Sequence, residues 1–187
     1  MKKYNEMWHD APSQMKYRKQ EQVVLKVFRE MYPRNKVEEE ILVKVQILNL
    51  FYSTNIFNTT VVAGHIFKIT NIDELLKKAD AGIVETMAQV TFQGKGTRKF
   101  YSFATKYCHH HNPTGYPIYD KFVHKVLMHF KKQDHFHVFG SEDLKDYGKF
   151  KIAICAFMKF YSLEKYSFRE LDIYLWLLGK EYFEPKR

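Results

Sequence analysis

The chain has 187 residues, of which 45% are hydrophobic and 17% aromatic. This apolar fraction is enough for a packed core and excludes wholesale disorder, and the length suits one compact domain. The 30 Lys and Arg residues outnumber the 21 Asp and Glu residues, which gives a formal net charge of +9 at pH 7. A basic balance of this size favours a polyanionic partner, nucleic acid before an acidic membrane or a nucleotide.

Three features of the sequence predict a cytoplasmic protein with no membrane partner. The opening Met1-Lys2-Lys3 is followed by polar residues, unlike a secretory signal. The longest uninterrupted apolar run, 152–158, is far shorter than a membrane span. The two cysteines, Cys108 and Cys155, each lie in an apolar or aromatic run, so we expect two buried free thiols in a reducing compartment.

Apolar residues at helical spacing recur along most of the chain, whereas no segment shows a clean strand alternation bounded by a hairpin turn. Residues 1–12 are expected to form a loose, flexible polar arm. We expect Ser13, Asn35 and Ser141 to cap helices, and Ser167 and Glu170 to form a capping box. In chain order, the predicted helices cover 13–32, 35–51, 61–66, 72–79, 83–92, 100–111, 120–130, 141–159 and 167–178.

The predicted fold is therefore all-α, a compact bundle of about nine short helices. Residues 13–187 are expected to form a single helical domain, or two lobes with a cleft between them. The 16 Phe and 13 Tyr residues exceed what a core alone needs, so some of these rings are expected to line a groove or pocket. The alternative is a core built largely of aromatic side chains.

A glycine turn is the first candidate site. Residues 93–99 read Gln-Gly-Lys-Gly-Thr-Arg-Lys and lie between two predicted helices. Gly94 and Gly96 allow positive φ and a close backbone approach, and free N–H groups at the start of a helix can hold a phosphate. Lys95, Arg98 and Lys99 add positive charge at the same place. An ordinary solvated loop with lysines is the alternative reading of such a short motif.

Three consecutive histidines, 109–111, suggest a metal site at first sight. Neighbouring residues on a helix point about 100° apart, so the three side chains cannot share one ligand face. No carboxylate at helical spacing completes a site, and His135 and His137 would have to be brought in by tertiary folding. We therefore predict no metal and no other cofactor.

Asp120 is the second candidate site, because it directly precedes the predicted helix that begins at Lys121. The carboxylate is well placed to cap that helix by accepting hydrogen bonds from unpaired N–H groups. In a second role the same carboxylate would face a cleft and take part in chemistry. The sequence leaves both roles open.

The order of these features resembles the helix-hairpin-helix DNA glycosylase superfamily. The matching features are a Gly-x-Gly turn, a helix, Pro117-Ile118-Tyr119-Asp120 and a further helix. The stretch from Tyr116 to Leu127 is similar to the adenine glycosylase form of this region, and the stretch from Ser102 to Asp120 also resembles a group of uncharacterised bacterial proteins. The turn departs from the family's Leu-Pro-Gly start, since this chain has Phe92-Gln93-Gly94.

The resemblance implies a DNA-binding protein that cleaves the N-glycosidic bond of a nucleotide flipped out of duplex DNA. It implies a catalytic role for Asp120 and a Schiff-base role for Lys99 or Lys106. The segment from Gly94 through Lys95, Gly96 and Thr97 to Arg98 would bind the DNA backbone. Three tyrosines would contact the extruded base: Tyr52, Tyr101 and Tyr119. Phe103, on the same predicted helix, is expected to pack in the core.

Two other functions fit the same residues. One is a non-catalytic nucleic-acid-binding domain of the same fold, which needs the basic turn but no catalytic carboxylate. The other is a helical protein-interaction domain in which Asp120 is only a cap. The sequence indicates neither a base or lesion nor an oligomeric state.

Overall fold

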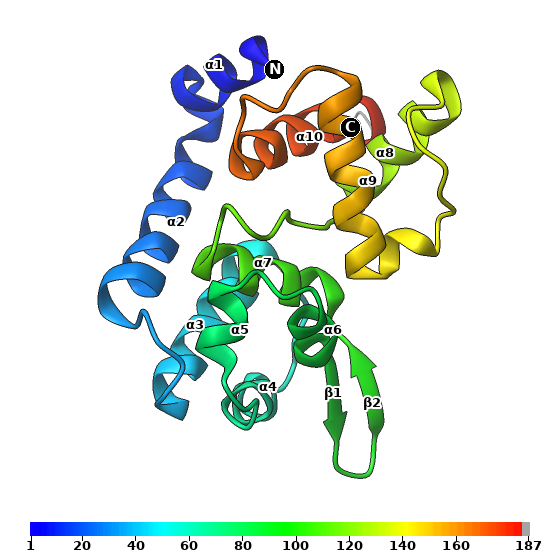
Figure 1. The fold of residues 1–187 in the computed structure, drawn as a ribbon. Coiled ribbons are helices and arrows are strands. Elements are labelled where there is room, and N and C mark those ends of the chain that lie inside the picture. The colour runs from blue at the N-terminus through cyan, green and yellow to red at the C-terminus, as the bar shows by residue number, and fades with distance from the viewer. Residues whose placement is uncertain (185–187) are drawn as a thin grey trace. The chain divides into compact units, whose positions relative to one another are not determined.

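A computed structural model describes residues 1–184 (Figure 1). This part of the chain contains ten α-helices, three short helical turns of other types and one two-stranded sheet, so the prediction of a mostly helical protein is confirmed. Contacts within the chain define two compact units. We call residues 16–116 the central unit, and residues 1–15 together with the chain from Pro117 onward the terminal unit.

The central unit is built around two well-buried helices, α3 and α7. Helix α3 packs against α4 and α7, and α7 packs against α6. Nearly every side chain of α7 up to His110 is buried, which is why its sequence is rich in aromatic and small residues. The elements of this unit are α2 (Met15–Leu25), the π-helical turn η2 (Lys26–Met31), α3 (Glu38–Tyr52), α4 (Thr59–Phe67), α5 (Ile72–Lys77), α6 (Gly82–Ala88), β1 (Gln89–Phe92), β2 (Gly96–Lys99) and α7 (Tyr101–His111).

The terminal unit is organised by its last helix, which packs against α8 and α1. A Cβ atom on Gly179 would lie 2.6 Å from Cβ of Phe122, so glycine is what lets α10 and α8 approach so closely. The predicted capping box of Ser167 and Glu170 opens this helix. The elements are α1 (Lys2–Asp10), η1 (Pro12–Gln14), α8 (Lys121–Asp134), η3 (Asp143–Lys145), α9 (Tyr147–Phe160) and α10 (Phe168–Phe183).

Residues 2–10 form helix α1, where the sequence predicted a loose arm. Tyr4 and Trp8 lie one helical turn apart and are both buried. The Tyr4 hydroxyl donates a hydrogen bond to Glu181 at 2.7 Å, and the Trp8 ring meets that of Trp176 edge to face at 6.3 Å. The prediction was wrong because two aromatic anchors suffice to dock an otherwise polar segment on α10.

The predicted helix 83–92 is wrong in its second half. Helix α6 ends at Ala88, and residues 89–92 form strand β1, which pairs antiparallel with β2 in the register Gln89–Lys99 to Phe92–Gly96. Figure 1 shows this hairpin extending away from the helices of the central unit. Gly94 and Gly96 have φ of +70° and +74°, so the two glycines make a tight turn possible between strands rather than helices.

Three predicted helix caps are also corrected. Ser13 lies inside η1, and Asp146 rather than Ser141 caps α9. Helix α3 begins after Val37, while Asn35 is buried and bonded to other side chains.

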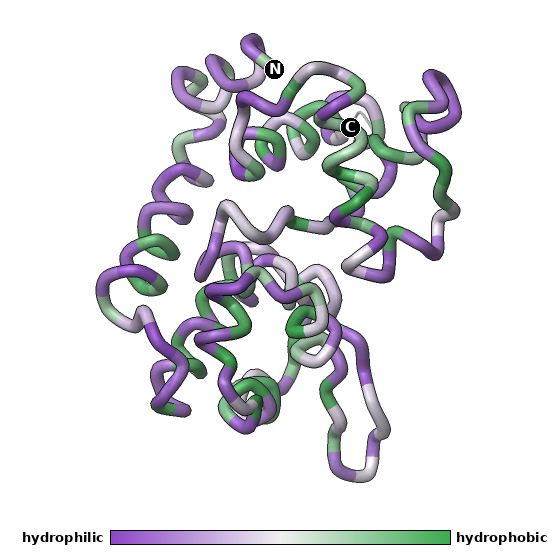
Figure 2. Tube along the Cα trace, in the orientation of Figure 1, coloured by the Kyte–Doolittle hydropathy of each residue, from purple (hydrophilic) through white to green (hydrophobic). Residues whose placement is uncertain are grey.

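Figure 2 shows mainly hydrophobic residues along α4, the helix that flanks the β-hairpin.

Candidate nucleic-acid interface

The β-hairpin presents the predicted phosphate-binding residues at its exposed end. Residues 93–99 are all exposed, and Lys95 N–H donates to the carbonyl oxygen of Phe92 at 3.0 Å to close the turn. The hydroxyls of Thr91 and Thr97 lie 2.8 Å apart across the two strands. The segment 89–99 contains no acidic residue. The structure therefore gathers the predicted residues 94–98 on one basic projection.

A pocket of about 480 Å³ lies between this hairpin and the start of α4. Phe57 and Val61 come from the α4 side, Phe92 from the end of β1, and Phe100 from the position between β2 and α7. The rings of Phe92 and Phe100 meet edge to face with centroids 6.0 Å apart. Phe57, Asn58, Val61, Phe92, Gln93, Lys95, Arg98 and Phe100 line the pocket.

The pocket combines an apolar wall with positive charge. The guanidinium carbon of Arg98 lies 6.0 Å from the centre of the Phe92 ring, a cation–π distance. None of the described lining residues is acidic. Phe57, Phe92 and Phe100 were not predicted as site residues, although the excess of aromatic residues in the composition indicated that some rings would line a pocket.

Lys99 and Tyr101 lie at the base of the hairpin. The Lys99 ammonium is 2.6 Å from a carboxylate oxygen of Glu85 and 4.9 Å from the centre of the Tyr101 ring. Lys99 is therefore tied to α6 by an ion pair, an arrangement that a search for a Schiff-base lysine by sequence spacing could not foresee.

Lys106 and Tyr52 come together inside the central unit. Lys106 is 5% exposed, and its Nζ donates to Ser102 Oγ at 2.6 Å, one helical turn earlier on α7. The same Nζ lies 5.6 Å from the centre of the Tyr52 ring, and the Tyr52 hydroxyl is 2.9 Å from His110 Nε2. Two residues proposed from sequence for different roles thus share one largely buried environment. Phe103 is buried in the core, as predicted.

The three consecutive histidines have three different environments. His109 Nδ1 is 2.7 Å from the Tyr116 carbonyl oxygen, His110 contacts Tyr52, and His111 Nε2 is 3.4 Å from Nζ of Lys44. Their directions differ as the helical geometry requires. Within residues 1–184, no three His, Cys, Asp or Glu side chains gather in a way that could hold a metal ion.

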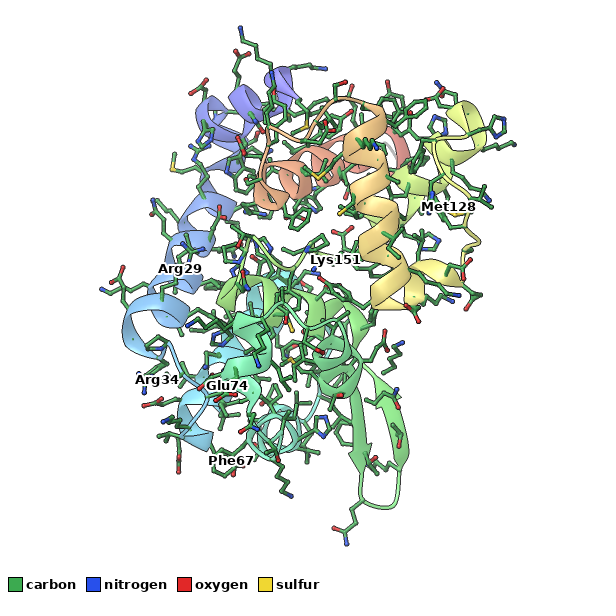
Figure 3. All side chains as sticks on the ribbon, in the orientation of Figure 1. Arg29, Arg34, Phe67, Glu74, Met128 and Lys151 are labelled. Atoms are coloured by element: carbon green, nitrogen blue, oxygen red, sulfur yellow. The ribbon has the colours of Figure 1, made fainter. Side chains whose placement is uncertain are left out.

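Lys44 is the centre of a buried polar cluster that the sequence did not indicate. This lysine is fully buried, and its Nζ donates to the carbonyl oxygen of Arg34 at 2.8 Å and to Asn35 Oδ1 at 2.6 Å. Tyr107 donates to the same Asn35 oxygen, and Asn35 Nδ2 donates to Asp73 at 2.7 Å. Figure 3 labels Arg34, whose carbonyl oxygen accepts one of the hydrogen bonds of Lys44.

Burial shifts the pKa of two groups in this cluster. Desolvation lowers the pKa of Lys44 to about 8, against the opposing attraction of Asp73. Desolvation, together with the nearby Lys44 charge, lowers the pKa of His111 well below its usual value, so the ring is neutral and can accept a hydrogen bond. The cluster ties the segment after η2 to α3, α5 and α7, which gives it a role in the fold.

Asp120 and Tyr119 belong to the terminal unit, whereas all other predicted site residues belong to the central unit. Oδ1 of Asp120 accepts hydrogen bonds from the N–H groups of Phe122 and Val123, both at 2.8 Å, so the predicted helix cap is confirmed. The Tyr119 hydroxyl is 3.0 Å from His124 Nδ1, and burial raises the pKa of Tyr119.

The two cysteines differ from each other. Cys108 is buried in α7, and desolvation raises the pKa of its thiol well above the usual value. Cys155 is exposed on α9, so the prediction of two buried thiols is wrong for this residue. Both are free thiols.

Among the described helices, none is both long and apolar enough to cross a membrane.

Comparison with known proteins places the chain in a family without assigning it an activity. Residues 1–115 match the HI_0787_N family, described as an N-terminal domain, and the chain belongs to this family. The match ends one residue before the central unit does. An uncharacterized protein of Haemophilus influenzae (strain Rd) is 49% identical over 148 residues, which cover 79% of this chain and 70% of that protein. No solved structure matches the chain.

Proposed function

We propose that this chain is a nucleic-acid-binding protein and that the β-hairpin of the central unit contacts the phosphate backbone. The observation that carries the proposal is the hairpin's exposed basic end, with Lys95 and Arg98 beside an aromatic pocket and no acidic residue between Gln89 and Lys99. Exposed Lys and Arg side chains on a projecting hairpin can approach a phosphate backbone without first losing buried partners.

The charge of the central unit supports the same proposal. Residues 16–116 contain 15 Lys and Arg residues against 9 Asp and Glu residues, a net charge of 15 − 9 = +6 out of the total of +9. The unit that bears the hairpin therefore also carries most of the positive field that would attract a polyanion.

Salt dependence of binding tests the proposal. Labelled DNA, as a 12-nucleotide strand and as a 12-base-pair duplex, is titrated with the full chain at several salt concentrations and followed by fluorescence anisotropy. We expect Lys95→Ala combined with Arg98→Ala to weaken binding and to reduce the slope of log K against log salt by roughly 1 to 2, because each lost phosphate contact removes about 0.7 to 0.9.

The matched control is Lys77→Ala combined with Lys78→Ala, which removes two exposed charges from the end of α5 in the same unit. This control should change the slope by clearly less than the hairpin double variant. Failure of the wild-type chain to bind either DNA at low salt, or equal slopes for the two double variants, would show that the hairpin is not a nucleic-acid interface.

Base-excision glycosylase activity is a second candidate, favoured by one observation. Lys106 is nearly buried beside Tyr52 and Ser102, and desolvation is one way in which a lysine becomes a nucleophile. The β-hairpin stands against it, because the superfamily's glycine hairpin joins two helices. Asp120→Asn separates the role of Asp120 as a helix cap from a role in catalysis, since Asn caps a helix about as well as Asp but has no carboxylate.

The experiment uses duplexes that carry mismatched or oxidised bases and measures alkali-sensitive strand breaks. Breakage by the wild-type chain that is lost in Asp120→Asn, with unchanged thermal stability, would support the glycosylase. An absence of breaks with every duplex, alongside intact DNA binding, would leave the non-catalytic function alone.

A further inference from the structure

The pocket beside the hairpin has an unusual wall. Phe57 is 92% exposed, so almost the whole ring is in contact with solvent although it borders an apolar concavity. Exposed aromatic rings beside a pocket mark binding surfaces more often than rings scattered over a surface do. The pocket volume of about 480 Å³ lies within the range of sites for small organic groups.

The chemistry of the lining selects a ligand with one flat apolar face and one anionic group. Phe57, Phe92 and Phe100 offer ring surfaces, and Lys95 and Arg98 offer positive charge at the same pocket. A nucleotide unit has both features, because its base can stack on an aromatic ring while its phosphate pairs with a cation. An apolar peptide would leave the two cations without partners, and a purely anionic ligand would leave the rings exposed.

A paired base cannot use this pocket. In a duplex both faces of each base are covered by its stacked neighbours, so that only base edges and the backbone are accessible to a protein. A base in a single strand can turn one face toward an aromatic side chain. The exposed ring of Phe57 therefore favours an unpaired base, whereas the basic end of the hairpin serves a single strand and a duplex equally.

The pocket has few groups that could read a base edge. The side-chain oxygen of Asn58 accepts a hydrogen bond from the N–H group of Val61 at 3.2 Å and caps α4. The Asn58 amide nitrogen and the Gln93 side chain are the remaining uncharged polar groups among the described lining residues. Stacking dominates such a site, and stacking accepts every base.

We infer that the hairpin pocket holds one unpaired base of a single-stranded nucleic acid, with the adjoining phosphate at Lys95 and Arg98. This inference rests on the proposed function and adds a preference for single strands over duplexes. Discrimination among the four bases is weak, because the recognised feature is the flat face that all of them share.

The test compares an oligothymidylate of 12 nucleotides with a duplex of 12 base pairs at one salt concentration. The wild-type chain is expected to bind the single strand about ten times more tightly, and Phe57→Ala to remove about that factor for the single strand alone, since loss of one stacked base costs roughly this much affinity. Phe67→Ala is the matched control, because Phe67 is an exposed ring at the last residue of α4, the helix that follows Phe57, but is absent from the pocket lining (Figure 3).

A second experiment changes the ligand and keeps the wild-type chain, so its result does not depend on how a variant folds. A strand of abasic sites with the same number of phosphates should bind the wild-type chain as weakly as oligothymidylate binds Phe57→Ala. Thymidine monophosphate in excess should displace the strand only weakly, and full displacement at micromolar concentration would indicate a free-nucleotide site instead.

Two outcomes separate this inference from the proposed function. Equal affinity of the wild-type chain for strand and duplex, unchanged by Phe57→Ala, would overturn the base pocket and leave the phosphate-binding hairpin standing. Absence of binding to either DNA at low salt would overturn the proposed function itself.

Discussion

Lys44 and Arg98 are both cations of the central unit, and they lie in opposite surroundings. Lys44 is fully buried and hydrogen-bonded to Asn35 and to the backbone of the segment after η2. Arg98 is exposed on β2, at cation–π distance from Phe92 and on the border of an open pocket. The first arrangement uses charge to fix the fold, and the second leaves charge accessible to a ligand.

The difference teaches where to look for function in a basic protein. A buried cation whose donors are already bonded to backbone carbonyls has little to offer a partner, because binding would first require those bonds to break. A cation on a projecting hairpin has no such cost. The two regions should therefore respond differently to mutation: the buried cluster through stability, and the hairpin through binding.

Replacing Lys44 should have the largest effect on stability. We expect Lys44→Met to lower the free energy of unfolding by about 3 kcal/mol, because the variant leaves the carbonyl oxygens of Tyr32 and Arg34 and the Asn35 oxygen without the donor they share. Urea unfolding followed by circular dichroism measures this. Lys78→Met, at an exposed lysine of the same unit, is the control. A loss below about 0.5 kcal/mol in Lys44→Met would show that the cluster does not hold the fold.

The fold class could be predicted from the sequence because helical spacing of apolar residues is a local signal. The segments that became α7, α8 and α10 have long apolar faces and clear ends, such as Asn112-Pro113 after α7. The hairpin was missed because its strands have only four residues each, and β2 is exposed along its whole length. A strand of that kind shows no alternation of burial.

The candidate site could be predicted only in part, for a reason of the same kind. The basic turn around Gly94 and Gly96 is contiguous in sequence, so the order of residues in one short segment was enough to predict it. The pocket is not contiguous, since Phe57 is brought to the hairpin only by the packing of α4 against β1. Asn35 likewise resembles a helix cap in sequence, and only its tertiary partners Lys44 and Tyr107 explain its burial.

Acid should weaken the buried cluster through His111. Its pKa in the folded chain is well below the usual value, so below about pH 6.5 the unfolded chain binds a proton that the folded chain does not. The free energy of unfolding should therefore fall as the pH drops from 6.5 to 5, by at most about 1.4 kcal/mol per pH unit for this one group.

His111→Phe isolates that contribution. Phenylalanine keeps the ring contacts with Phe28 and Tyr107 but cannot take up a proton. The difference in unfolding free energy between wild type and variant should shift in the variant's favour as the pH falls. A difference that stays constant from pH 7 to pH 5 would show that His111 titrates alike in both states.

Of the three predicted effects on the free energy of unfolding, that of Gly94→Ala should be the smallest. This variant tests the hairpin, whereas Lys44 and His111 test the buried cluster. A Cβ atom at Gly94 would meet nothing within 4 Å, so the cost comes from the φ of +70° alone and should be about 1 kcal/mol. Gly94→Asn is the matched variant, because asparagine adopts the left-handed region more readily than alanine and should lose less. Urea unfolding gives both values. A loss in Gly94→Ala as large as that in Lys44→Met would mean that the hairpin end supports the core, and the contrast between a cluster that holds the fold and a hairpin free to bind would fail.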